Sequence, residues 1–233
     1  ENIMSDLSTI EIQVLPAEYI ETIKSKKSKG YYFFKRLFAI ITSFLMIIIL
    51  SPLMLLFAFL VKVTSKGPIL FKDVRIGKGG KHIKIWKYRS MYYDSESNIE
   101  KYLSPEQIEQ WRREKKVDND PRVTKLGKFM RKTSIDELPQ LFNILTGRIA
   151  IVGPRPITTK EYANYSKPEI QLLTSTRPGL TGIWQVYGRS NVTYGSGLRQ
   201  KMDMEYFEKR SLLFDLKIIF LTIPAVFKGN GAE

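Results

Sequence analysis

The stretch "LFAIITSFLMIIILSPLMLLFAFLV", Leu37 to Val61, is the longest apolar run in the sequence and contains no charged residue. As one straight helix it would be about 37 Å long, enough to cross a hydrocarbon core of about 30 Å. The run is too long, and begins too far into the chain, to be a cleavable signal. The first structural prediction is therefore a helix embedded in a membrane.

Ser51-Pro52, near the middle of this run, indicates a break. Proline removes a backbone hydrogen bond and bends a helix, and the Ser51 hydroxyl can bond a carbonyl that the bend frees. Both flanks are basic, although positive residues prefer the cytoplasmic side. A re-entrant helix keeps both flanks on the cytoplasmic side. The alternative is a proline-kinked helix that spans the membrane and places one basic flank on the other side. The basic residues are Lys24, Lys26, Lys27, Lys29, Lys35 and Arg36 before the run, and Lys62, Lys66, Lys72, Arg75, Lys78 and Lys81 after it.

The composition points to an anionic partner. The 233 residues include 37 Lys and Arg against 23 Asp and Glu, for a formal net charge of +14. Nucleic acid, anionic lipid and a phosphorylated substrate all fit this excess, as does a merely soluble basic surface. With no Cys a disulfide framework is excluded, and with a single His a structural zinc site is not expected, so a metal would be a hard cation held by oxygen. The chain begins with Glu, so it is expected to be a fragment or to start natively at Met4.

Three regions follow from these patterns: a polar N-terminal segment (1–34), a membrane segment (35–62) and one compact domain (63–233) attached to it. The N-terminal segment could form one short helix ending at Gly30. Two alternating runs around "GKGG" (77–80) predict a β-hairpin, and Ser104-Pro105 opens a predicted helix through Lys116. "VTKLGKFMRK" (123–132) has the pattern of a short amphipathic helix, with Arg131 on its polar face, lying on a membrane or simply on the protein surface. The apolar C-terminal stretch from Ser211 is either core or a second interfacial helix.

The stretch "TSIDELPQLFNILTG" (133–147) places two adjacent acids, Asp136 and Glu137, in a basic neighbourhood. The stretch reads as a helix start, with Pro139 in the first turn, a buried stripe of leucines and Phe142, and a stop at Gly147. In that position the two acids could simply be capping groups.

Arginines on loops that contain glycine and proline favour a chemical role for the two acids. "IVGPRP" (151–156) holds Arg155 between two prolines, and "TRPGLTGIWQVYGRS" (176–190) contains Arg177 and Arg189 among glycines. Rigidly held arginines suit bidentate binding of phosphate, so a polyanionic ligand is expected. An acid of the pair could hold Mg²⁺ against its phosphates, or attack phosphorus as a nucleophile.

The sequence resembles the bacterial sugar transferase family, the monotopic polyprenyl-phosphate phosphoglycosyl transferases. The resemblance is carried by "DPRVTKLGKFMRKTSIDELPQLFNILTGRIAIVGPRP" and "RPGLTGIWQVYGRS", and runs from about Lys35 to Phe227, except for a polar stretch near 94–118. It implies transfer of a sugar-1-phosphate from a UDP-sugar to undecaprenyl phosphate, giving an undecaprenyl-diphosphate sugar and UMP. It also implies that the membrane helix is re-entrant, with its break at Ser51-Pro52, in the cytoplasmic membrane of a bacterium. Residues 63–233 would then be the catalytic domain, on the cytoplasmic face.

The resemblance also implies roles for individual residues. Asp136 would be the nucleophile that forms a phosphosugar-aspartyl intermediate, Glu137 would bind Mg²⁺, and Arg155 would bind substrate phosphate. Further candidates for substrate binding are Asp203, Arg177, Arg189 and Lys87.

The expected fold class is α/β, mostly α, with the broken membrane helix, a small β-hairpin and amphipathic surface helices. Expected partners are the UDP-sugar, undecaprenyl phosphate and membrane lipids, and a homodimer is the default oligomer. No base-reading motif is present, so nucleic acid is not expected. A non-catalytic membrane-anchored nucleotide- or lipid-binding scaffold for polysaccharide assembly is the alternative function.

Overall fold

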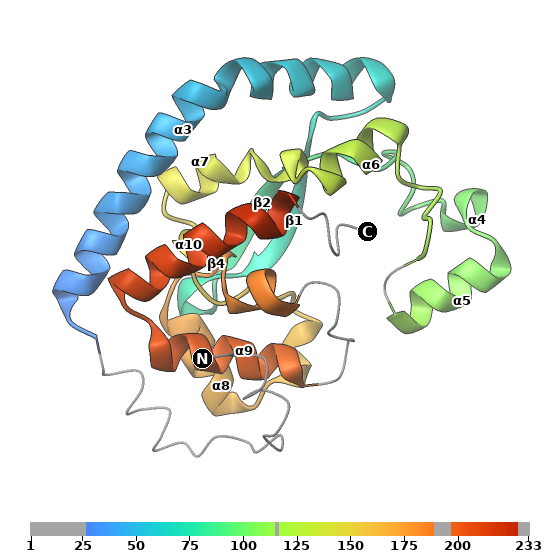
Figure 1. The fold of residues 1–233 in the computed structure, drawn as a ribbon. Helices are drawn as coiled ribbons and strands as arrows, with labels where there is room; N and C mark the ends of the chain where they lie inside the picture. The colour runs from blue at the N-terminus through green and yellow to red at the C-terminus, as the bar shows by residue number, and fades with distance from the viewer. Residues whose placement is uncertain (1–26, 115–116, 189–196, 228–233) are drawn as a thin grey trace.

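The long apolar run forms helix α3 (Lys29–Thr64), whose two arms meet at a bend in Figure 1. The computed structural model describes residues 27–114, 117–188 and 197–227, so the predicted N-terminal helix and Arg189 lie outside the described residues. Pro52 lies inside α3, and its missing N–H leaves the Ile48 carbonyl without its helical partner. The Ser51 hydroxyl donates to that carbonyl at 2.8 Å, which confirms the role predicted for it.

Both arms of α3 pack on the same part of the protein. Ala39, in the first arm, packs in one cluster with Ile85, and Phe57, in the second arm, packs in another with Tyr88. Ile85 and Tyr88 both belong to strand β2 (His82–Tyr88). The Tyr88 hydroxyl also donates to the Met54 carbonyl at 2.8 Å. The two arms are therefore held against one scaffold.

The other side of α3 presents large apolar side chains to the surroundings. Leu55 is 71 % exposed and Ile49 is 67 % exposed. Within the described residues, α3 is the one helix whose length and composition would let it cross a membrane. Further exposed apolar residues of this helix are Ile41, Phe44, Leu45, Ile48, Leu56, Phe59 and Val63. A soluble core helix would bury such side chains, so this face is suited to lipid.

The predicted hairpin is present as antiparallel β1 (Leu70–Ile76) and β2, with Leu70 opposite Tyr88 and Ile76 opposite His82. Gly79 and Gly80 form the turn with positive φ, where a side chain would be strained. After it come α4 (Ile99–Tyr102), α5 (Pro105–Glu114) and α6 (Lys125–Lys132). Thr124 caps α6 by accepting from Gly127 N. The helices predicted at Pro105 and within 123–132 are confirmed.

Helix α7 (Gln140–Leu145) buries a face that differs in part from the one predicted. The predicted stripe is right in part: Leu138 and Leu141 pack against core clusters, but Phe142 is 37 % exposed. The buried residues of the helix are Gln140, Asn143 and Ile144. Asn143 accepts from Trp86 N at 2.9 Å and donates to the Lys84 carbonyl at 2.8 Å. This pairing satisfies the free edge of β2, which a leucine could not do.

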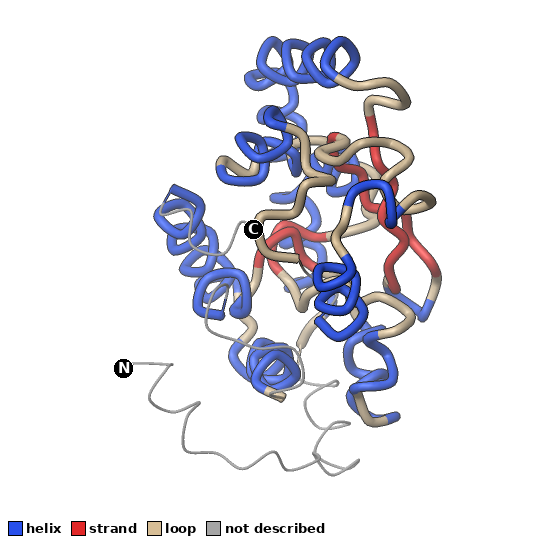
Figure 2. The backbone as a smooth tube through the Cα atoms, turned by 90° about the vertical axis from the view of Figure 1, so that its right-hand side faces the viewer, coloured by secondary structure: helices blue, strands red, loops and turns tan. Residues whose placement is uncertain are grey.

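The rest of the chain builds a second strand pair and three more helices. Strand β3 (Ala150–Val152) runs parallel to β4 (Gly179–Thr181), a pairing that the sequence did not predict. Around them lie α8 (Lys167–Ser175), α9 (Leu198–Lys209) and α10 (Leu212–Phe227). In Figure 2 strands lie near the centre and along the right-hand side of the molecule, with helices above and below them. The fold is mostly helical, as predicted.

Candidate active site

The acid pair lies on a short turn between α6 and α7. Ser134 takes up left-handed backbone angles (φ 56) directly after α6 and turns the chain. Asp136 and Glu137 then occupy a single 3-10 turn, η2 (Ile135–Glu137), and Pro139 precedes α7. The acids are therefore not side-chain caps of α7, which begins three residues after Glu137.

The two carboxylates have different surroundings. Asp136 is only 7 % exposed, whereas Glu137 forms a salt bridge with the Lys87 ammonium at 2.8 Å. Burial and the neighbouring charge of Glu137 raise the pKa of Asp136 to about 6, although Lys87 and Arg131 act in the opposite direction. Asp136 is thus a poorly solvated carboxylate whose ionised form the protein disfavours.

Arg131 belongs to this site, although the amphipathic pattern of its helix predicted that it would lie on the polar face. Its Nε donates to the Ser90 hydroxyl at 2.9 Å, and its charge interacts with that of Asp136. The helical spacing contains a signal for this placement. Gly127, one turn earlier, packs so closely on the Ser90 carbonyl that a Cβ would not fit, so position 131 also faces inward.

The acid pair is compatible with Mg²⁺. Within the described residues there is no group of three or more His, Cys, Asp or Glu side chains that could form a complete metal cage. Mg²⁺ does not require one, because it is usually bound by one or two carboxylates, with substrate phosphates and water completing its octahedron. The mutual repulsion that raises the Asp136 pKa is also what a cation would relieve.

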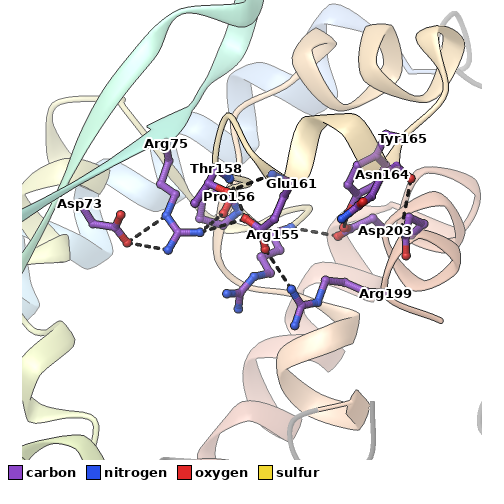
Figure 3. A network of polar contacts seen from close by, with 11 residues as sticks. Asp73, Arg75, Arg155, Pro156, Thr158, Glu161, Asn164, Tyr165, Arg199 and Asp203 are labelled. Carbon is purple, nitrogen blue, oxygen red and sulfur yellow. Dashed lines mark hydrogen bonds and ion pairs between the residues drawn. The ribbon is translucent and has the colours of Figure 1, made fainter. Parts of the chain in front are cut away.

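A second polar cluster surrounds Arg155, on the loop after β3 (Figure 3). The Arg155 backbone N–H donates to Asp203 Oδ1 at 2.9 Å, and the Tyr165 hydroxyl donates to Asp203 Oδ2 at 3.0 Å. Burial raises the pKa of Asp203 to about 6, although these hydrogen bonds oppose the rise. Because both carboxylate oxygens accept from the protein, Asp203 orients the loop that presents Arg155.

The Arg155 guanidinium stacks on Trp184, 4.4 Å from the ring centroid. Arg199, at the start of α9, lies 4.5 Å from the same centroid, and the Arg199 guanidinium also pairs with Glu161 at 3.0 Å. Neither Arg199 nor Glu161 was singled out from the sequence. The structure thus brings two arginines, distant in the chain, to one aromatic ring.

Arg177 has a different place. Its Nε donates to the Gly147 carbonyl at 2.6 Å, just past the end of α7. Arg36 of α3 donates to the Ile144 and Leu145 carbonyls of the same helix end. Cations here complement the negative end of the helix dipole. Among the candidates, Lys87 therefore joins the acid pair, Asp203 joins Arg155, and Arg177 caps α7.

The comparisons with known proteins agree on one family. The profile described as "Bacterial sugar transferase" matches residues 30–229. The exopolysaccharide production protein ExoY of Rhizobium meliloti is 40% identical over 200 residues, which cover 85% of this chain and 87% of that protein.

Two longer relatives match over a similar part of this chain. The undecaprenyl-phosphate galactose phosphotransferase of Salmonella typhimurium is 40% identical over 203 residues, covering 86% of this chain and 42% of that protein. The UDP-glucose:undecaprenyl-phosphate glucose-1-phosphate transferase of Klebsiella pneumoniae is 42% identical over 201 residues, covering 84% of this chain and 40% of that protein. The matched region thus spans about two fifths of these longer relatives. This chain belongs to the bacterial sugar transferase family, and it is a transferase enzyme.

Proposed function

We propose that this transferase moves a sugar-1-phosphate from a UDP-sugar to undecaprenyl phosphate, giving an undecaprenyl-diphosphate sugar and UMP. The observation that carries the proposal is identity of about 40% with relatives named for this transfer, over more than four fifths of the chain. We place this reaction at the start of exopolysaccharide or capsule assembly, and the similarity to an exopolysaccharide production protein supports the exopolysaccharide role.

The proposed mechanism has two displacements at one phosphorus atom. A carboxylate oxygen of Asp136 bonds to the β-phosphorus of the donor, while the bond from that phosphorus to the bridging oxygen breaks and UMP leaves with its electrons. An oxygen of undecaprenyl phosphate then bonds to the same phosphorus, and the carboxylate of Asp136 is released. The burial of Asp136 supports this role, because desolvation raises the reactivity of an ionised carboxylate.

Positive groups around the acid pair would offset the repulsion between a carboxylate and a diphosphate. Glu137, and Asp136 before it reacts, would hold Mg²⁺, which when bound neutralises phosphate charge as it redistributes. Lys87 keeps Glu137 in place at 2.8 Å, and Arg131 adds a second positive charge near Asp136. Arg155 is proposed to bind a substrate phosphate.

A UMP-release assay tests the function. Purified protein with Mg²⁺ and undecaprenyl phosphate is given UDP-glucose, UDP-galactose and N-acetylated UDP-sugars in turn. One of these donors is expected to give UMP and a lipid-linked sugar in equal amounts. A scaffold would bind a nucleotide or lipid and release no UMP with any donor, and that result would reject the enzyme reaction proposed here.

We also propose that α3 enters and leaves one leaflet of the bacterial inner membrane, with the catalytic domain on the cytoplasmic face. Three features support this: the bend at Pro52, the exposed apolar outer face, and the packing of both arms on β2. A spanning helix would separate its two ends by the bilayer, whereas here both ends contact one scaffold. Helix α10 adds Leu213 and Phe220, which are 80 % and 68 % exposed, as a second apolar surface.

Cysteine labelling tests the topology cleanly, because the chain has no Cys of its own. Single replacements Lys29→Cys, at the start of α3, and Lys78→Cys, in the exposed hairpin turn, are each treated with a membrane-impermeant maleimide in sealed vesicles. Re-entry predicts that both cysteines react in inside-out vesicles and that neither reacts in right-side-out vesicles. Reaction of the two cysteines from opposite sides would show a spanning helix and reject the proposed topology.

A further inference from the structure

Two buried polar atoms, one on Arg155 and one on the ring that it contacts, have no hydrogen-bond partner within the described part of the chain. They are Arg155 Nε and Trp184 Nε1. The Arg155 guanidinium stacks on the Trp184 ring, which brings these two donors to one place. Buried polar groups in folded proteins are almost always paired, so two unpaired donors at one place point to a ligand that accepts hydrogen bonds.

Two guanidinium groups meet at this place, and the nearby carboxylates of Glu161 and Asp203 offset part of their charge. Arg155 and Arg199 both lie within 4.5 Å of the Trp184 ring centroid. Burial lowers the pKa of Arg155, and the nearby charge of Arg199 lowers it further. Two guanidinium groups on one ring repel each other, so an anion that contacts both would be bound strongly. Two positive forks and an indole N–H match the oxygens of a phosphate group.

Glu161 holds this arrangement together (Figure 3). Its buried carboxylate pairs with Arg199 at 3.0 Å and with Arg75 at 3.3 Å, and accepts from Thr158 N at 2.7 Å. Arg75 comes from β1, Thr158 from the loop that carries Arg155, and Arg199 from α9. One carboxylate therefore joins three separate segments and compensates part of their positive charge.

We propose that Arg155, Arg199 and Trp184 form a phosphate-binding subsite, and that Glu161 is the residue that positions its arginines. The proposal rests on the function proposed above, since it assigns the phosphate to a substrate of that reaction. The phosphate belongs either to the UDP-sugar or to undecaprenyl phosphate, and kinetics with each substrate varied separately distinguishes the two. Glu161 itself contacts no substrate, because its carboxylate is occupied by the protein.

Glu161→Gln tests the positioning role. The amide keeps the shape and can still accept from Thr158 N, but it removes the charge that holds the arginines. We expect KM to rise about 10-fold or more for one of the two substrates, the loss typical of a charge-assisted hydrogen bond, while kcat changes less than about 3-fold. The substrate whose KM rises identifies the source of the phosphate.

Asp94→Asn is the matched control, because it makes the same chemical change in the exposed Asp94–Lys101 pair and should leave both KM values unchanged. Unchanged KM values in Glu161→Gln would overturn the proposal. A lower KM would also overturn it, since Glu161 would then merely compete with the phosphate for the arginines. If kcat fell while both KM values stayed unchanged, the proposal would also be overturned, because Glu161 would then position the groups that react and not the groups that bind the phosphate.

A second variant covers the case in which Glu161→Gln does not fold. Arg199→Gln leaves Glu161 paired with Arg75 and should raise the same KM, whereas Arg112→Gln, on the exposed side of α5, should not. If the wild-type protein releases no UMP, the proposed reaction fails. Equilibrium binding of UDP and of undecaprenyl phosphate to wild type and Glu161→Gln then tests the subsite separately, and equal affinities in the two proteins would overturn it.

Discussion

The Asp136→Asn protein is expected to release UMP at least about 1,000-fold more slowly than wild type while keeping its fold. Asparagine is nearly the same shape as aspartate but cannot attack phosphorus. The raised pKa of Asp136 shows that the folded protein disfavours its ionised form, owing to burial and to the charge of Glu137. Removing that charge relieves the repulsion, so the variant should be at least as stable as wild type. A buried charge that is kept for catalysis lowers the stability of the folded protein, so a substitution that removes the charge is expected to raise stability while activity is lost.

The measurement combines UMP release with trapping of the intermediate. Protein treated with donor labelled in the β-phosphate, without lipid acceptor, is digested and the label is mapped. Wild type should carry the label on Asp136, the variant should carry none, and Asp94→Asn should behave as wild type. Near-normal turnover by Asp136→Asn, or label on another residue, would show that a different group attacks the donor.

Local signals in the sequence were enough to predict much of the fold. The Ser51-Pro52 pair predicted both the bend in α3 and the hydroxyl bond to a freed carbonyl, because the two effects depend on residues within one turn. The glycines of "GKGG" predicted the hairpin turn, and Ser104-Pro105 predicted the start of α5. In each case the residues that decide the conformation are neighbours in the chain.

Long-range pairing accounts for what the sequence did not predict. Leucine spacing indicated the buried face of α7, but Asn143 is buried because its amide pairs with β2, more than 50 residues away. The parallel pairing of β3 and β4 joins two strands of three residues each, which are too short to show a periodic pattern. Such contacts depend on which distant segments meet.

The same distinction applies to the candidate site. Asp136 and Glu137 are adjacent, so their shared location could be predicted, and Arg155 was marked by its flanking prolines. Glu161 and Arg199 were missed because their pairing crosses 38 residues of chain. Arg177 was chosen by the same reasoning as Arg155, since it also precedes a proline, yet it caps α7. A glycine- and proline-shaped loop therefore indicates that an arginine is held rigidly, without indicating what it binds.

The Asp215→Asn protein is expected to unfold at a temperature about 6 to 20 °C below that of wild type. Asp215, in α10, pairs with Lys35 of α3 at 2.8 Å, and its side chain is only 9% exposed. It also accepts from the hydroxyls of Tyr31 and Tyr206, each at 3.0 Å. Removing one member of a buried pair leaves the other charge uncompensated, which costs about 3 to 5 kcal/mol. For a chain of this size each kcal/mol lowers the unfolding midpoint by about 2 to 4 °C.

Thermal unfolding in detergent measures this effect, and a double replacement shows its origin. Lys35→Met with Asp215→Leu removes both charges and should recover most of the loss, because an apolar pair of similar volume avoids the cost of burying ions. Asp94→Asn, which breaks an exposed pair, should shift the midpoint by less than about 4 °C, the effect of at most 1 kcal/mol. If Asp215→Asn unfolded as wild type does, the pair would not contribute to holding α3. The remaining contacts of the first arm, the packing of Ala39 on Ile85 and the hydrogen bonds from Arg36 to the end of α7, would then be what holds it.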